Sequence, residues 1–193
     1  MASVFDGAAG AFVAWVMARA NRAAEAEAIE RLAPAADHHV LVIGFGPGVG
    51  VRLLAARMTA GEVVGVDPST TMARTAARAN RAAIAVGRVA LHVARADAVP
   101  APDATFDSAI AVNALQLCEP FAATCAELAR VLKPGARLVG LTHDWALAGR
   151  AGSVGAWNAM AGAALETAGF VEIAAFRGRA ERGKIVGLTA RRG

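Results

Sequence analysis

Four glycines within seven residues are the feature of this sequence whose chemical use is easiest to see. They stand at Gly44, Gly46, Gly48 and Gly50, directly after the apolar run at residues 40–43. The apolar run predicts a buried parallel strand, so the glycines occupy a strand-to-helix turn. Glycines there let backbone N–H groups approach a ligand at the helix N-terminus. The spacing is GxGxG, whereas nicotinamide dinucleotide sites carry GxGxxG, which disfavours a dehydrogenase.

Two aspartates follow later apolar runs that also predict strands. Asp67 comes directly after residues 62–66, nineteen positions beyond Gly48, and Asp97 follows residues 89–93. A carboxylate at the first position can accept hydrogen bonds from both hydroxyls of a ribose. At the position of Asp97, a side chain can reach an adenine amino group. Each aspartate alone is also explained as a turn or loop residue, but together with the glycines they predict a nucleoside site.

A histidine follows the fifth predicted strand at the same edge of the sheet. His143 and Asp144 come directly after the apolar run at residues 137–142. An unperturbed imidazole titrates close to neutral pH, so His143 is the candidate general base for a proton that must leave an acceptor. The alternative is a loop histidine without a catalytic part.

The elements that must position these residues alternate along the chain. Predicted strands lie at residues 40–43, 62–66, 89–93, 106–112, 137–142, 170–176 and 184–190, and predicted helices at 51–58, 69–83, 121–132 and 156–168. A helical prelude is expected at residues 11–20, followed by a second helix from Asn21 to Leu32. Strands that alternate with helices predict an α/β fold with a mainly parallel sheet covered on both faces, closed by an antiparallel strand at one edge.

Length and composition predict one globular domain across residues 1–193, with a helical N-terminal part at 1–36 and an α/β core at 37–193. Hydrophobic residues make up 56% and charged residues 19%, which excludes a disordered chain. The apolar stretch at residues 8–18 is too short to span a bilayer, and Asp6 precedes it, so we expect no export signal and a cytoplasmic protein without a membrane partner. Cys118 and Cys125 match no zinc spacing, and we expect no metal.

The charge balance raises nucleic acid as a partner. The net charge is +4 and the isoelectric point is near 10.0. The arginines, however, are scattered among acidic residues, and a chain without tyrosine and with 5% aromatic residues offers few surfaces for base stacking. The sequence therefore predicts no nucleic-acid partner.

Five segments, in order, resemble the motifs of class I S-adenosylmethionine-dependent methyltransferases. Residues 40–48 (VLVIGFGPG) resemble the family's first motif. The others are 64–69 (VGVDPS), 96–100 (ADAVP), 106–110 (FDSAI) and 127–138 (ELARVLKPGARL). The resemblance covers residues 38–142 and is nearest to the small-molecule methyltransferases of ubiquinone and menaquinone biosynthesis.

That resemblance implies a three-layer α/β/α Rossmann-like fold with seven strands in the order 3-2-1-4-5-7-6, the seventh antiparallel. It implies S-adenosylmethionine as cofactor, S-adenosylhomocysteine as product and a small-molecule methyl acceptor as partner, with a homodimer as the candidate assembly. The implied cofactor-binding residues are Gly44, Phe45, Gly46, Gly48, Asp67, Pro68, Met72, Asp97, Ala98 and Asn113. The implied catalytic residues are His143 and Asn113. Phe12, Trp15, Arg19, Leu117 and Trp145 are the candidate substrate-pocket residues.

One residue departs from the family pattern. The first motif usually carries an acidic residue that orients the loop or engages the methionine amino group, and this chain has Val42 there. This keeps open an inactive, cofactor-binding partner or regulatory protein. An RNA or protein methyltransferase is a weaker alternative, because residues 113–116 (NALQ) do not form the proline-containing tetrapeptide expected after the fourth strand.

Overall fold

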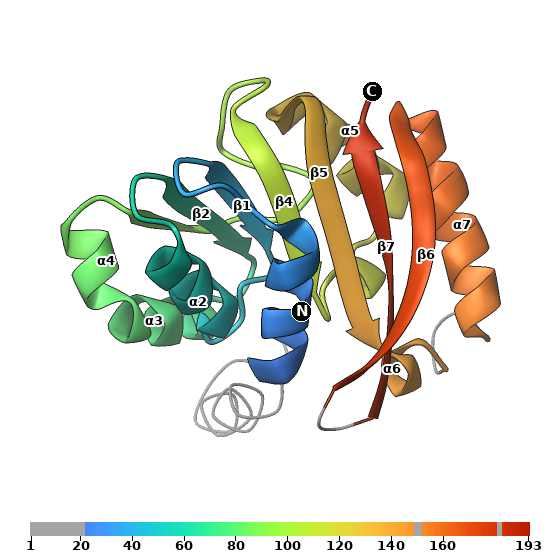
Figure 1. Ribbon diagram of the computed structural model, residues 1–193, viewed down its shortest axis with the longest axis horizontal. Coiled ribbons are helices and arrows are strands. Elements are labelled where there is room, and N and C mark those ends of the chain that lie inside the picture. The colour runs from blue at the N-terminus through green and yellow to red at the C-terminus, as the bar shows by residue number, and fades with distance from the viewer. Residues whose placement is uncertain (1–21, 149–151, 181–182) are drawn as a thin grey trace.

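The computed structural model describes residues 22–148, 152–180 and 183–193. Within them, seven strands form one sheet in the order β3-β2-β1-β4-β5-β7-β6 (Figure 1). The seventh strand runs antiparallel to both of its neighbours, and the remaining pairs are parallel. This confirms the predicted Rossmann-like methyltransferase fold and its strand order. The antiparallel strand β7 lies one place in from the edge, which β6 forms.

The strands are β1 (His39–Ile43), β2 (Glu62–Asp67), β3 (Val89–Val93), β4 (Phe106–Val112), β5 (Leu132–His143), β6 (Phe170–Ala180) and β7 (Gly183–Arg192). The helices are α2 (Val49–Arg57), α3 (Thr70–Ala79), α4 (Arg81–Ala85), η1 (Leu115–Leu117), α5 (Phe121–Val131), α6 (Asp144–Ala148) and α7 (Val154–Thr167). An N-terminal helix, described over residues 22–32, precedes β1.

Two apolar clusters, one on each face of the sheet, fix the three layers. Successive side chains of a strand point to opposite faces. Leu41 and Ile43 of β1 therefore join the cluster that holds α5 and α7. Val40 and Val42 join the one that holds the N-terminal helix, α2 and α3. All four are at most 4% exposed, as a parallel strand covered on both faces requires. In Figure 1 the N-terminal helix (blue) and α2 lie in front of the sheet.

The parallel registers bring the carboxyl ends of four strands to one edge. Ile43 pairs with Val66 on one side and with Ala111 on the other. Val66 in turn pairs with His92, and Val112 pairs with Leu141. The residues that follow each of these strands are therefore neighbours along a single edge, where ligands of open α/β sheets bind.

One predicted helix is in fact two. The sequence predicts a continuous helix over residues 69–83, but α3 ends at Ala79 and α4 begins at Arg81. The side chain of Asn80 between them donates from Nδ2 to the carbonyl oxygens of Gly48 and Ala76. Because its amide bonds the backbone locally and reaches the glycine turn, Asn80 interrupts the helix to hold that turn.

The last three strands are longer than the sequence predicts. β5 begins at Leu132, directly after α5, where residues 133–135 were expected to be a loop. The register between β4 and β5 shifts after Phe106, and that irregularity accommodates the proline of this segment. The β6–β7 hairpin also extends beyond the predicted limits at residues 176 and 190, since its ladder pairs continue to Ala180 with Gly183.

Some predictions fall on parts of the chain that the structure does not describe. The helix at residues 11–20, the cap at Asn21 and the pocket residues Phe12, Trp15 and Arg19 all lie outside the described residues. In the remainder, each helix is too short or too polar to cross a membrane.

Candidate functional site

The glycine turn between β1 and α2 leaves one face open. Gly46 has a φ of +51°, and a Cβ added there would meet no atom of the described residues within 4 Å. Its N–H donates to Asp67 Oδ2 at 2.9 Å. At Gly48, by contrast, an added Cβ would lie 2.6 Å from Asn80 Nδ2 and 2.8 Å from Ala76 Cβ. Gly48 is therefore required for packing against α3, whereas Gly46 borders space that a ligand can occupy.

Two other residues of this turn pack against the hydrophobic core. Gly44 packs against Ala114, whose Cβ would lie 2.5 Å from an added methyl group. The ring of Phe45 is 2% exposed and covers Gly65 of β2. Any contact of Phe45 with a ligand at this edge is therefore through its backbone.

Asp67 joins the glycine turn to the start of α3. Its Oδ2 accepts from the Gly46 N–H and its Oδ1 from the Ser69 N–H, both at 2.9 Å. The residue is 8% exposed, and burial raises the pKa of its carboxyl, opposed by these two backbone N–H groups. Each carboxylate oxygen has a second acceptor position, so Asp67 can bind two further donors without losing its structural bonds.

The two residues that were predicted beside Asp67 lie differently. Pro68 is exposed, at the edge of the sheet. Met72 is 3% exposed and packs in the core, with its backbone N–H donating to the capping Ser69 Oγ at 3.3 Å. A cofactor role for the Met72 side chain therefore has less support than one for Pro68.

Asp97 forms a bidentate ion pair that the sequence analysis missed. Arg95 Nε and Nη2 donate to the two carboxylate oxygens at 2.8 and 2.6 Å, and this pairing lowers the pKa of Asp97. Arg95 also donates to the Glu119 carbonyl at 2.7 Å, so it links the loop after β3 to the loop before α5. The Ala98 N–H donates to the Arg95 carbonyl at 3.2 Å. The positions of Arg95 and Asp97, two residues apart in the chain, are the sequence signal from which this ion pair could have been predicted.

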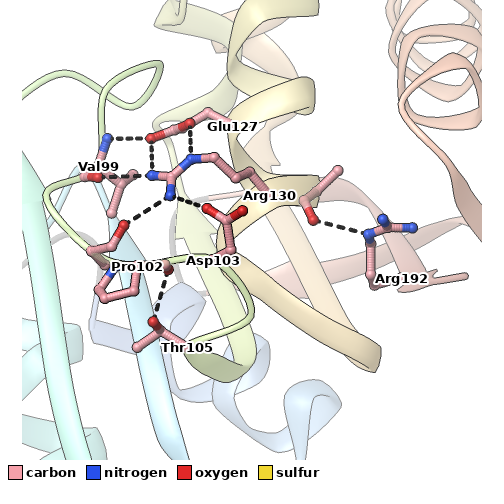
Figure 2. Close-up of polar contacts among 9 residues, drawn as sticks. Val99, Pro102, Asp103, Thr105, Glu127, Arg130 and Arg192 are labelled. Atoms are coloured by element: carbon pink, nitrogen blue, oxygen red, sulfur yellow. Dashed lines mark hydrogen bonds and ion pairs between the residues drawn. The ribbon is translucent and has the colours of Figure 1, made fainter.

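Arg130 of α5 holds the remainder of that loop in place (Figure 2). Its guanidinium donates to the Val99 and Ala101 carbonyls at 3.1 and 2.9 Å, and to Asp103 Oδ1 at 2.7 Å. Glu127 Oε1 accepts from Arg130 and also from the Val99 N–H, each at 2.7 Å. Glu127 and Arg130, both in the 127–138 segment, therefore position the loop that carries Asp97.

We expect Arg130→Ala to loosen this loop and leave the sheet intact. Hydrogen exchange at the Val99 amide should accelerate by at least about 10-fold, because the partner that orients Glu127 is lost. Arg192→Ala is the matched control, since that guanidinium also bonds α5, at the Ala129 carbonyl, but has no bond to the loop. Exchange at Val99 that changes equally in both variants would contradict the assignment.

Asn113 connects the ends of β4 and β5. Its Oδ1 accepts from Thr142 Oγ1 at 3.0 Å and from the His143 backbone N–H at 3.1 Å, and it lies 3.2 Å from His143 Nδ1. Because an amide oxygen only accepts, Nδ1 carries the proton of the neutral ring and Nε2 is the basic nitrogen. Asn113 has a φ of +54°, a conformation that asparagine tolerates better than most residues.

His143 is more enclosed than a loop histidine would be. It is the last residue of β5, is 1% exposed, and pairs with Ile185 of β7. Its ring lies 5.7 Å from that of Trp145, centroid to centroid. Trp145 and Leu117, both predicted to line a pocket, are 67% and 47% exposed at the same edge of the sheet.

A buried carboxyl that the sequence analysis did not single out faces the start of α2. Glu25 of the N-terminal helix is 9% exposed, and a Cβ added at Gly50 would lie 2.8 Å from its Cδ. Burial raises the pKa of Glu25 from 4.5 to about 8. Helical periodicity with Ala24 and Ala28, which are both fully buried, was the signal that placed it on the inner face.

This burial predicts a pH-dependent stability. The folded protein keeps a proton on Glu25 that the unfolded chain releases near pH 4.5, so the stabilising contribution is complete below that pH and is lost as pH rises to about 8. Each pKa unit corresponds to about 1.4 kcal/mol. Because glutamine stays neutral, we expect Glu25→Gln to lose less stability than wild type between pH 5 and pH 9, measured by urea denaturation. Glu30→Gln, on the exposed side of the same helix, should follow wild type.

Residues 40–135 match a protein family described as "Methyltransferase domain". The match begins in β1 and ends in β5, so it contains the glycine turn, Asp67, Asp97 and Asn113.

Curated relatives share the same central region. An O-methyltransferase of Penicillium expansum is 34% identical over 109 residues, which are 56% of this chain and 39% of the relative. A demethylmenaquinone methyltransferase of Symbiobacterium thermophilum is 34% identical over 102 residues, which are 52% of this chain and 41% of the relative. The chain thus spans about two fifths of the length of these relatives.

Solved structures match over most of the chain. A methyltransferase from Aquifex aeolicus, described as dependent on S-adenosylmethionine, superposes with a TM-score of 0.74 at 18% identity, covering 91% of this chain and 93% of that one. A geranyl diphosphate methyltransferase in complex with S-adenosylmethionine gives 0.74 at 17% identity, covering 97% and 92%. At these identities the likeness concerns the fold.

Proposed function

We propose that the chain is a class I methyltransferase that binds S-adenosylmethionine and transfers its methyl group to a small-molecule acceptor. The names of the relatives, O-methyltransferase and demethylmenaquinone methyltransferase, support a small acceptor. The homodimer and the division of the chain at residue 36 stay predictions.

The hydrogen bond between Asp67 and Gly46 is the observation that carries the proposal. It places a carboxylate with unused acceptor positions beside the one glycine of the turn that borders open space. A nucleoside needs two hydroxyl acceptors and an approach to the backbone, and these residues fit both requirements. Under the proposal, Asp67 binds the ribose, Gly46 lies against the methionine part, and Asp97 with Ala98 lies at the adenine.

The bound cofactor supplies a methyl group that its sulfonium sulfur has already activated. The protein therefore has to align the acceptor and keep water away. We place Asn113 and His143 at the acceptor, with Leu117 and Trp145 as exposed apolar surface that an acceptor can cover. If the acceptor loses a proton, His143 Nε2 receives it, because the contact with Asn113 keeps the other ring nitrogen protonated.

Titration calorimetry with S-adenosylhomocysteine tests the cofactor part of the proposal. We expect one site with a dissociation constant in the micromolar range, corresponding to about 7–8 kcal/mol, and no heat with NAD. Transfer of labelled methyl from S-adenosylmethionine to a panel of phenols, quinols and amines tests the acceptor part. Folded protein that binds neither S-adenosylhomocysteine nor S-adenosylmethionine would contradict the proposal.

The second candidate, an inactive cofactor-binding protein, is favoured by Val42 alone. Val42 is 4% exposed within an apolar cluster, so β1 provides no carboxylate to the turn. Binding of S-adenosylhomocysteine without transfer to any acceptor of the panel would favour this candidate.

A further inference from the structure

The N-terminal helix brings a carboxyl group to the start of α2, directly after the glycine turn. Glu25 projects toward Gly50, in the first turn of α2. An added methyl at Gly50 would collide with Oε2 and Cδ of Glu25, so the glycine is what admits this side chain. The neighbouring apolar residues Ala24 and Ala28 hold the helix against Val40 and Val42 of β1.

No hydrogen bond or ion pair joins Glu25 to any residue within the described ranges. Charged or titratable residues on the elements that contribute to its apolar cluster include Arg52, Arg57, Asp67, Arg74, Arg78, His143 and Lys184. Within the part of the chain that the structure describes, burial raises the pKa of Glu25 and no charged side chain contributes to the shift. A carboxylate in such surroundings becomes favourable only when a cation arrives with a ligand.

We propose that Glu25 binds the α-ammonium group of the methionine part of the cofactor, in place of an acidic residue on β1. The inference rests on the proposed function. It joins three features: the open face at Gly46, the partnerless carboxyl beside Gly50, and a β1 without acidic residues. The α-carboxylate of the same ligand suits the free N–H groups in the first turn of α2, so the two ends of one zwitterion have complementary partners.

Binding then requires Glu25 to give up its proton. At pH 7 the free protein holds this carboxyl mostly protonated, because burial raises its pKa to about 8. The ammonium group favours the ionised form, so the proton leaves to solvent as the ligand enters. Close to one proton should be released for each molecule bound.

Two ligands separate this role from a general structural one. S-adenosylhomocysteine carries the ammonium group, whereas 5′-methylthioadenosine keeps the nucleoside and the thioether but lacks the amino acid part. We expect Glu25→Gln to weaken the first by about 30-fold and the second by less than about 2-fold, by calorimetry at pH 7. Glu30→Gln, an exposed change on the same helix, should alter neither. Glu25→Asp keeps the carboxylate and should fall between wild type and Glu25→Gln.

Proton release is the second measurement. Titrations of wild type in buffers of different ionisation enthalpy should give nearly one proton released with S-adenosylhomocysteine and none with 5′-methylthioadenosine. Glu25→Gln should release none with either. Equal losses for both ligands, or unchanged affinity for S-adenosylhomocysteine, would overturn the inference and leave the proposed function standing. Wild type that binds neither ligand would instead overturn the proposed function.

Discussion

Replacing Asp67 with alanine is expected to weaken the binding of S-adenosylhomocysteine by at least about 100-fold. Hydrogen bonds to a charged group contribute about 1.5–3 kcal/mol each, and a ribose would lose two of them. The change also removes the acceptor of the Gly46 N–H, so the turn loses part of its support. Calorimetry on the purified variant, with circular dichroism to verify folding, measures the loss.

Asp107→Ala is the matched control for this experiment. Asp107 also accepts a backbone N–H, that of His39 at 2.9 Å, and it pairs with Lys133 at 2.6 Å. It lies near the amino end of β4, at the opposite edge of the sheet from Asp67. We expect a decrease in stability with unchanged affinity. Similar losses of affinity in both variants would show that the effect of Asp67 is a general loss of structure.

The strand order could be predicted because the sequence carries its signals locally. Short apolar runs predict the strands, and the polar or glycine residues that follow several of them, such as Gly44, Asp67 and Asn113, predict the edge at which these strands end. Two boundaries were wrong for physical reasons that act over a distance. Asn80 ends α3 to reach Gly48, 32 residues earlier in the chain. Residues 133–135 lie within β5, despite a proline that favours a loop, because the pairing with β4 is made on either side of them, at Leu132 and at Arg137.

The site residues could be predicted where a characteristic residue type coincides with a turn in the sequence. They could not be predicted where contacts with distant residues decide whether a side chain is buried or faces the site. Gly46 and Asp67 follow from spacing, but the sequence could not show that Gly44 and Gly48 are occupied by packing. Glu25 was overlooked because a glutamate in a helix is ordinarily exposed. Its burial depends on Gly50, which belongs to a motif 25 positions away.

The second large effect is expected from Gly46→Ala, which should abolish detectable binding of S-adenosylhomocysteine while the protein still folds. The new methyl group meets no atom of residues 22–148, 152–180 or 183–193 within 4 Å, so it projects into the space assigned to the ligand. The backbone cost of alanine at a φ of +51° is about 1 kcal/mol, which a domain of this size tolerates.

Gly87→Ala separates that backbone cost from the loss of the site. Gly87 has a φ of +72°, and an added Cβ there also meets nothing within 4 Å, but it lies in the turn between α4 and β3. Both variants should therefore lose similar stability in urea denaturation, and only Gly46→Ala should lose affinity by more than about 100-fold. Because both changes place the same methyl group on the same kind of backbone, a difference in affinity between them reports on the occupied space alone. Equal affinities would mean that the ligand does not lie against the open face of the glycine turn.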